Sequence, residues 1–210
     1  MVIDSAQFAL FLISTLILNI TPGPDMIFTA ANGMQRGMKA GVVSATGIGF
    51  GALVHASFAA VGISALIAAS DLAFDILRFA GATYLIWIGV KSFRSGAVRF
   101  GNLTVPMMPY SVLFARGVVT NILNPKVALF FIAFLPQFID PSAGNVALQI
   151  FVLGCLVGVS GTFVNGLVGV FAGGAGRLFL QNPTSAKWIS RVSGCLLVGL
   201  GMRLLFLERN

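Results

Sequence analysis

The sequence predicts an all-α integral membrane protein with six transmembrane helices, arranged as two inverted three-helix repeats. Hydrophobic residues make up 57% of the 210 residues and charged residues only 9%, whereas soluble domains have about 25% charged residues. The chain divides into six apolar stretches, and short motifs of its first half recur in its second half. We therefore expect a single transmembrane domain over residues 1–210, and not a soluble or disordered chain.

Charged and turn residues bound the six stretches, because hydrophobic periodicity carries no signal where a helix is apolar all round. Membrane crossing takes about 20 mostly apolar residues. The predicted spans cover residues 5–33, 40–67, 72–93, 112–138, 145–172 and 188–206. The first and fourth spans are longer than one crossing requires and contain prolines, so we expect both of these helices to be broken.

The connections between the spans alternate in charge. Three connections carry basic residues and no acids: Arg36, Lys39, Lys91, Arg94, Arg99, Arg177 and Lys187. The other side holds most of the acids, with two basic residues: Asp4, Asp71, Asp75, Asp140, Glu208, Arg78 and Arg209. The positive-inside rule then places the basic connections in the cytoplasm and both termini outside. The net charge of +7 reflects this topology and not a nucleic-acid partner, since no basic face forms.

The internal repeat rests on two pairs of motifs. Residues 19–25 read Asn-Ile-Thr-Pro-Gly-Pro-Asp and correspond to Asn-Ile-Leu-Asn-Pro-Lys at residues 121–126. Arg-Phe-Ala-Gly at residues 78–81 corresponds to Arg-Val-Ser-Gly at residues 191–194. Three spans per half invert the second copy, which gives repeats of about 1–100 and 101–210. Inverted repeats place a solute site near the membrane midplane and expose it alternately to each side.

The first pair of motifs is the predicted binding site. Proline lacks an N–H group and clashes with the carbonyl one turn back, so both motifs break their helices. Backbone groups left unpaired in a membrane persist only against protein or a watery cavity, where they can bind a polar solute. The candidate residues for substrate or ion binding are Asn19, Thr21, Pro22, Gly23, Pro24, Asp25, Asn121, Asn124, Pro125 and Lys126.

A charged residue directly follows each break, Asp25 in the first half and Lys126 in the second. A charge at the membrane centre costs at least about 2.5–3.5 kcal/mol, so both need partners. Asp25 and Lys126 are expected to pair with each other or to face the two ends of a zwitterion. A purely structural salt bridge that pins the broken helices is the alternative. Asp25 is also the first choice as a proton carrier.

Together with three further motifs, these residues resemble the lysine exporter (LysE/RhtB) family of amino-acid exporters. The further motifs are Gly-Ala-Thr-Tyr-Leu-Ile-Trp-Ile-Gly at 81–89, Phe-Ala-Arg-Gly at 114–117 and Phe-Leu-Pro-Gln-Phe at 134–138. The resemblance covers essentially the whole chain. It implies efflux of homoserine, threonine, leucine, lysine or related metabolites through the bacterial inner membrane, driven by proton exchange. Neither the residues nor the resemblance calls for a cofactor.

Several features leave alternatives open. His55, the one histidine, would suit a proton relay or simple hydrogen bonding inside the bundle. Asn165 would line the solute path or bond across helices. The glycine-rich second and fifth spans favour close helix packing and would allow a homodimer. Export of a divalent metal ion is disfavoured by too few ligands, and an intramembrane enzyme by the lack of a nucleophile–base pair.

Overall fold

The computed structural model describes residues 5–69, 71–94, 106–176 and 182–206, and every regular element in these ranges is helical. The all-α prediction is therefore confirmed for the described part of the chain. Several charges used above to assign topology lie outside the described residues: Asp4, Arg99, Arg177, Glu208 and Arg209.

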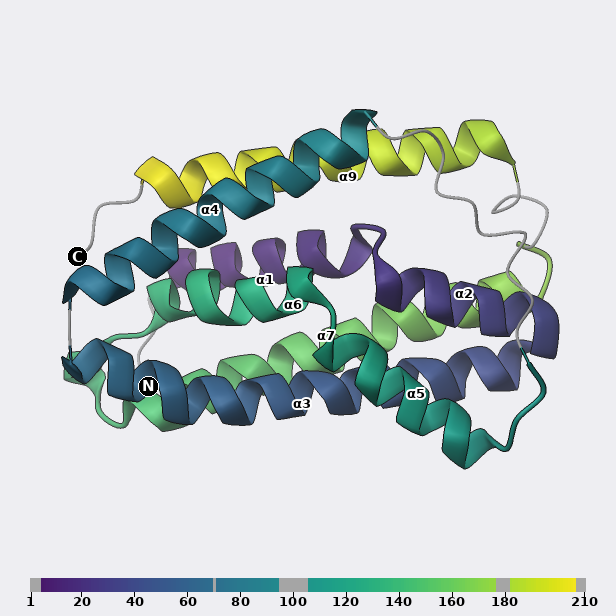
Figure 1. Ribbon diagram of the computed structural model, residues 1–210, viewed down its shortest axis with the longest axis horizontal. Coiled ribbons are helices and arrows are strands. Elements are labelled where there is room, and N and C mark those ends of the chain that lie inside the picture. The colour runs from purple at the N-terminus through teal and green to yellow at the C-terminus, as the bar shows by residue number, and fades with distance from the viewer. Residues whose placement is uncertain (1–4, 70, 95–105, 177–181, 207–210) are drawn as a thin grey trace.

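Each predicted span corresponds to one helix or to one broken pair of helices. The helices are α1 Ser5–Ile20, α2 Pro24–Arg36, α3 Met38–Ala69, α4 Asp71–Arg94, α5 Tyr110–Ile122, α6 Pro125–Leu129, α7 Val146–Gly173 and α9 Pro183–Phe206. After α6 the chain continues as a π-helical turn, Phe130–Phe134, and two 3-10 turns, Leu135–Phe138 and Pro141–Ala143. The helices run back and forth along the long axis, so that α1 begins and α9 ends at the same end of the molecule (Figure 1).

By length and composition, two of the described helices can cross a membrane on their own, α3 over Met38–Ala65 and α7 over Val146–Gly173. The count rises to four if each bent pair is one span. The first pair bends by 53° between α1 and α2, and the second by 49° between α5 and the segment Pro125–Phe138. The predicted breaks are confirmed, whereas six spans and an inverted repeat stay predictions.

Glycines let the long helices approach each other closely. A Cβ atom added to Gly41 of α3 would lie 2.6 Å from the Cα of Gly169 in α7, and one at Gly89 of α4 would lie 2.8 Å from the carbonyl oxygen of Gly194 in α9. Helix association in lipid depends on such close contact between small residues. The predicted role of the glycines in packing is therefore confirmed, and it joins α3 to α7 and α4 to α9 (Figure 1).

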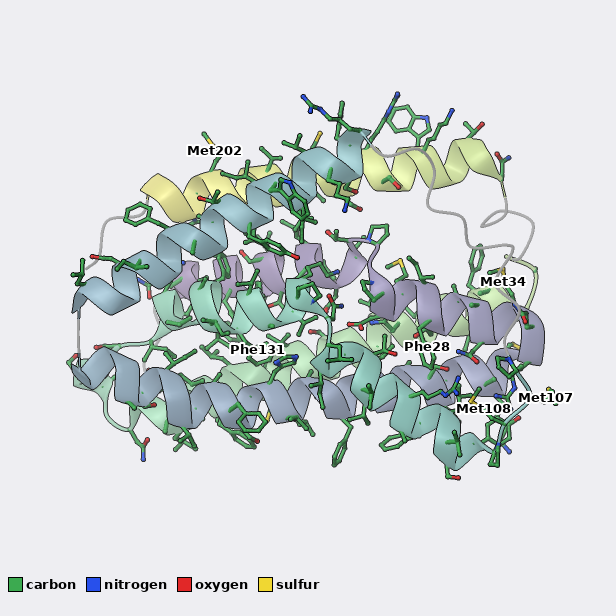
Figure 2. The ribbon with its side chains drawn as sticks, in the orientation of Figure 1. Phe28, Met34, Met107, Met108, Phe131 and Met202 are labelled. Carbon is green, nitrogen blue, oxygen red and sulfur yellow. The ribbon has the colours of Figure 1, made fainter. Side chains whose placement is uncertain are left out.

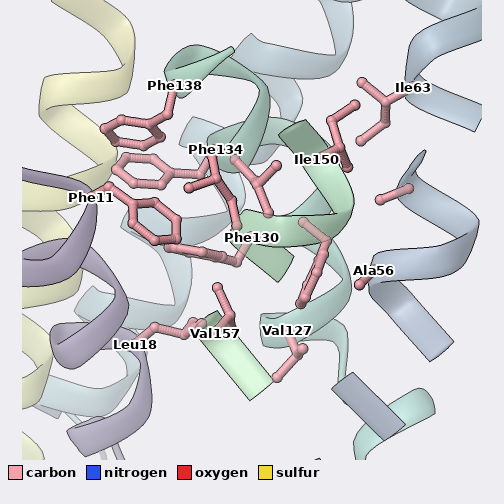
Figure 3. Packing of buried hydrophobic residues seen from close by; sticks show 14 of the residues in the cluster. Phe11, Leu18, Ala56, Ile63, Val127, Phe130, Phe134, Phe138, Ile150 and Val157 are labelled. Carbon is pink, nitrogen blue, oxygen red and sulfur yellow. The ribbon is translucent and has the colours of Figure 1, made fainter. Parts of the chain in front are cut away.

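Buried aromatic residues form the core around residues 130–138, the segment that follows the second helix break. Phe11 of α1 meets the ring of Phe138 edge-on at 5.3 Å, and Phe130 and Phe134 pack at 5.0 Å (Figure 3). The π-helical turn that carries these rings was not predicted from the sequence. Its physical reason is Pro136, whose ring would clash with the carbonyl one α-helical turn back. The wider turn, closed by the bond from Leu135 N–H to the Phe130 carbonyl, relieves that clash.

Basic residues gather at one end of the molecule, around the start of α5. Arg36 donates a hydrogen bond to the Met108 carbonyl, and Figure 2 shows Met107, Met108 and Met34 at this end. The Arg36 guanidinium and the Lys39 ammonium lie 5.6 and 5.1 Å from the centre of the Tyr110 ring. These cation–π contacts tie the turn between α2 and α3 to the N-terminus of α5.

Candidate functional site

The first helix break exposes two backbone carbonyls that Lys126 covers. In a regular helix the Leu18 carbonyl would accept a bond from the residue four positions on, but that residue is Pro22, which has no N–H group. The Lys126 ammonium fills this vacancy, because Nζ donates to the Leu18 oxygen at 2.8 Å and to the Thr21 oxygen at 2.7 Å. A side chain from the second half of the chain thus donates the hydrogen bonds that the carbonyls at the first break lack.

The second break follows the same rule. Pro125 has no N–H group for the carbonyl of Asn121, four residues earlier; that oxygen accepts from the Asn124 N–H at 2.9 Å, and His55 Nε2 lies 3.1 Å from it. Because a carbonyl only accepts, Nε2 must carry the hydrogen and donate it. The His55 ring also stacks on Phe131 at 5.5 Å, and Phe131 lies inside the molecule between the α6 segment and α3 (Figure 2). His55 therefore supports the break from α3.

Asn124 gives the second break its local geometry. Its backbone is extended, at φ −79° and ψ 105°, as expected for the residue before a proline. Its side-chain oxygen accepts from the Lys126 N–H at 3.1 Å and so caps α6. Asn124 is fully buried. The cap thereby fixes the backbone from which the Lys126 side chain reaches the first break.

Asp25 joins the first break to the second. Its Oδ2 accepts a hydrogen bond from Asn121 Nδ2 at 2.8 Å, and it lies close enough to Lys126 for the two charges to interact. Both charged side chains are buried, with exposed fractions of 7% and 6%. Their hydrogen bonds go to other groups and not to each other. The structure thus brings the two predicted charges together, and backbone carbonyls and an amide take the place of a direct salt bridge.

A small cavity adjoins this junction. Its polar lining comes from Asn19, Asp25, Asn121 and Asn165, and its apolar lining is Leu18, Ile48, Ala52, Val127, Val157 and three glycines. The volume of about 10 Å³ is near the minimum for a single water molecule. The site is therefore closed to an amino acid in this conformation.

The other predicted residues do not line this cavity. Thr21, Asn124 and Lys126 are buried, and Pro22, Gly23 and His55 are half-buried. Pro24 and Pro125 are exposed, so they shape the breaks through their backbones alone. Asn19 crosses from α1 to α7, where its Nδ2 donates to Ser160 Oγ at 3.0 Å.

Leu18 is the site residue that the sequence reading missed. Its carbonyl binds Lys126, although its side chain gives no polar signal. The signal that would have found it is its position four residues before Pro22, and the same count from Pro125 leads to Asn121. Among the described residues, no group of three or more His, Cys, Asp or Glu side chains comes together to hold a metal ion.

An apolar helical chain whose buried charges lie at two paired helix breaks defines a membrane protein built like the secondary transporters. The chain belongs to the LysE type translocator family, whose model matches residues 16–208. This membership fits the resemblance seen in the motifs and speaks against the alternative of an intramembrane enzyme.

Relatives match the chain over nearly its full length. A leucine efflux protein of Enterobacter sp. is 31% identical, with 94% of each chain covered. A homoserine/homoserine lactone efflux protein of Salmonella typhimurium is 34% identical, covering 92% of this chain and 93% of the relative. An uncharacterized membrane protein of Vibrio cholerae is 28% identical, covering 92% and 94%. No solved structure matches the chain.

Proposed function

We propose that this protein is a secondary exporter of small amino acids from the bacterial cytoplasm, with its substrate site at the junction of the two helix breaks. One observation carries the proposal: Lys126, Asp25 and Asn121 hydrogen-bond across the two breaks beside a polar cavity. Broken helices of this kind offer freed backbone groups and half-helix ends to polar solutes. The family and the named relatives supply the solute class.

The solutes named for the relatives narrow the chemistry. Leucine, homoserine and homoserine lactone all carry an ammonium group on the α-carbon, which also bears the carboxylate or lactone carbonyl. Leucine and homoserine also carry a free carboxylate, whereas the lactone does not. The ammonium group is therefore the charged feature that these solutes have in common, and we expect the cargo of this chain to carry it.

Transport requires the closed cavity to open alternately towards the two sides. We infer that the halves 1–100 and 101–210 form an inverted repeat of six spans, with the basic connections and their Arg36–Tyr110 cluster in the cytoplasm. The close packing of α3 with α7 and of α4 with α9 supports this arrangement, because each pair then joins corresponding helices of the two halves. Rocking one half against the other separates the two breaks and opens the cavity.

We further propose that protons drive export and that Asp25 carries the proton. Asp25 is the one acid among the buried residues of the described chain, and it lines the cavity. If protonation of the Asp25 carboxylate releases the substrate, proton entry is coupled to export of the substrate. A homodimer is also part of this proposal, although the glycines that pack α3 against α7 are already occupied within the chain.

The function is tested by efflux. A strain that overproduces the protein is screened for growth resistance to amino acids and dipeptides, and Asp25→Asn and Lys126→Met are compared with wild type at equal membrane levels. We expect resistance to one class of amino acid and loss of that resistance in both variants. Wild-type efflux by both variants would refute the proposed site. In reconstituted vesicles, export that is indifferent to an imposed pH gradient would refute proton antiport.

A further inference from the structure

The residues that line the cavity beside the breaks carry buried oxygen atoms without a hydrogen-bond partner. Three side-chain atoms of its lining residues are buried and have no partner, namely Asp25 Oδ1, Asn121 Oδ1 and Asn165 Oδ1. All three are oxygen atoms. The unpartnered buried nitrogens of the described chain belong to Arg36 and Asn124, which do not line the cavity.

The hydrogen-bond partners of Asn121 and Asn165 determine which side-chain atom of each is the amide nitrogen and which is the oxygen. Asn165 Nδ2 lies 2.9 Å from the Gly161 carbonyl, and Asn121 Nδ2 lies 2.8 Å from the Asp25 carboxylate. Carbonyl and carboxylate oxygens only accept, so the amide nitrogen must face them in both cases. Flipping either amide would place two acceptors against each other. The remaining Oδ1 atoms of Asn121 and Asn165 are therefore hydrogen-bond acceptors and not donors.

A buried acceptor without a donor costs about 1–3 kcal/mol, and more when it is charged. Asp25 and Asn165 have exposed fractions of 7% and 4% and come from different helices, α2 and α7. A ligand that donates to both would therefore bridge the first break to α7. The volume of about 10 Å³ accommodates a group the size of one water molecule, and a primary ammonium group has this size and three N–H donors.

We infer that the cavity binds the ammonium group of the exported amino acid, with Asp25 Oδ1 and Asn165 Oδ1 as its acceptors and no subsite there for the carboxylate. The inference rests on the proposed function and adds the substrate group that the site recognises. Leu18, Ile48, Ala52 and Val157 make the wall around this polar end, so the apolar part of a neutral amino acid would lie against them once the cavity opens.

Binding to the purified full-length protein tests this without requiring transport. The probes are methylammonium, 3-methylbutylammonium (leucine without its carboxylate) and 4-methylpentanoate (leucine without its ammonium group), measured by calorimetry and by thermal unfolding. We expect both ammonium probes to bind and the carboxylate not to bind. Binding of 4-methylpentanoate alone, or of no ammonium probe to the folded wild-type protein, would overturn the inference.

Asn165→Ala removes one acceptor, and Asn32→Ala is its matched control. Asn32 is equally buried, donates to a carbonyl four residues earlier, and also has an unpartnered oxygen, but it does not line the cavity. A bond to a charged group is worth about 1.5–3 kcal/mol, so Asn165→Ala should weaken ammonium binding roughly 10- to 100-fold. Asn32→Ala should leave it unchanged, and equal affinities of the two variants would overturn the assignment.

Three further outcomes show whether the ammonium site or the proposed function is wrong. In the first, NaCl stabilises the wild-type protein more than KCl does, with no binding of amines. If Asn165→Ala abolishes that difference in stability, the ligand is an alkali cation and the inference is overturned. Loss of amino-acid efflux from the growth screen, with ammonium binding retained, would refute the proposed function alone. Efflux that N-acetylation of the substrate does not impair would refute the ammonium site alone.

Discussion

Replacing Gly51 by alanine should disable the site without removing any polar atom. Gly51 lies on α3 against α5, and a Cβ atom there would lie 2.7 Å from Asn121 Cβ, 2.8 Å from the Val118 carbonyl oxygen and 2.9 Å from Asn121 Oδ1. Asn121 donates the hydrogen bond to Asp25, and its carbonyl accepts from His55. The added methyl group therefore pushes on the residue that joins the two breaks.

The size of the effect follows from these distances. Carbon atoms in contact lie about 3.5–4.0 Å apart, so relief of the 2.7 Å contact needs a shift of about 0.8 Å. Such a shift carried along the Asn121 side chain would stretch its 2.8 Å bond to Asp25 beyond hydrogen-bonding distance. Overpacking costs about 1–3 kcal/mol. Loss of a bond to a charged group adds about 1.5–3 kcal/mol, which corresponds to at least a tenfold loss of export.

Gly62→Ala in the same helix is the matched control, because a Cβ atom at Gly62 has no neighbour within 4 Å. Both variants are purified, their thermal unfolding midpoints are compared, and export is measured in vesicles at equal protein content. We expect Gly51→Ala to unfold at a lower temperature and to export at least tenfold more slowly, and Gly62→Ala to match wild type. Wild-type export by Gly51→Ala would refute the role given to the α3–α5 contact.

Two other substitutions probe the atoms that cover the breaks. His55→Gln keeps a donor that can reach the Asn121 carbonyl, whereas His55→Phe keeps only the stacking on Phe131. If His55 supports the break, Gln retains export and Phe lowers the free energy of unfolding by about 0.5–1.5 kcal/mol, because the Asn121 carbonyl keeps its bond from the Asn124 N–H. Loss of proton-driven export in His55→Gln would indicate a relay instead. Pro22→Ala restores an N–H group for the Leu18 carbonyl, which competes with Lys126. Export should fall several-fold while the thermal unfolding midpoint stays or rises, and a lower midpoint with normal export would contradict this.

Local chemistry explains why the sequence predicted the breaks and helices well. Proline restricts its own backbone and that of the preceding residue wherever it occurs, so the disruption at Pro22 and the extended Asn124 need no tertiary information. Composition likewise determines that the stretches are helical and apolar. The π-helical turn at Phe130–Phe134 was harder to predict from the sequence, because a proline such as Pro136 can either end a helix or widen it. Packing of the aromatic core decides between these two outcomes.

The partners of the buried charges could not be read from the sequence. The proposed repeat predicts that Asp25 and Lys126 lie in one region, where they pair with each other or face the two ends of a zwitterion. Which acceptor each charge takes depends on distances between helices that are far apart in the chain. The contact from His55 to the second break and the position of Asn165 at the cavity depend in the same way on how closely the glycines let α3, α5 and α7 approach.

The two breaks depend on each other, and this restricts what Lys126 can do during transport. Burying its charge costs at least about 2.5–3.5 kcal/mol, while each of its two bonds to the Leu18 and Thr21 carbonyls returns about 1.5–3 kcal/mol. Lys126 therefore cannot turn towards a substrate without leaving two buried carbonyls unpaired. We therefore expect Asp25, whose Oδ1 has no hydrogen-bond partner, to contact the substrate first when the cavity opens. Any motion that separates the breaks must also supply new donors for those carbonyls, and water entering the opening cavity is the nearest source.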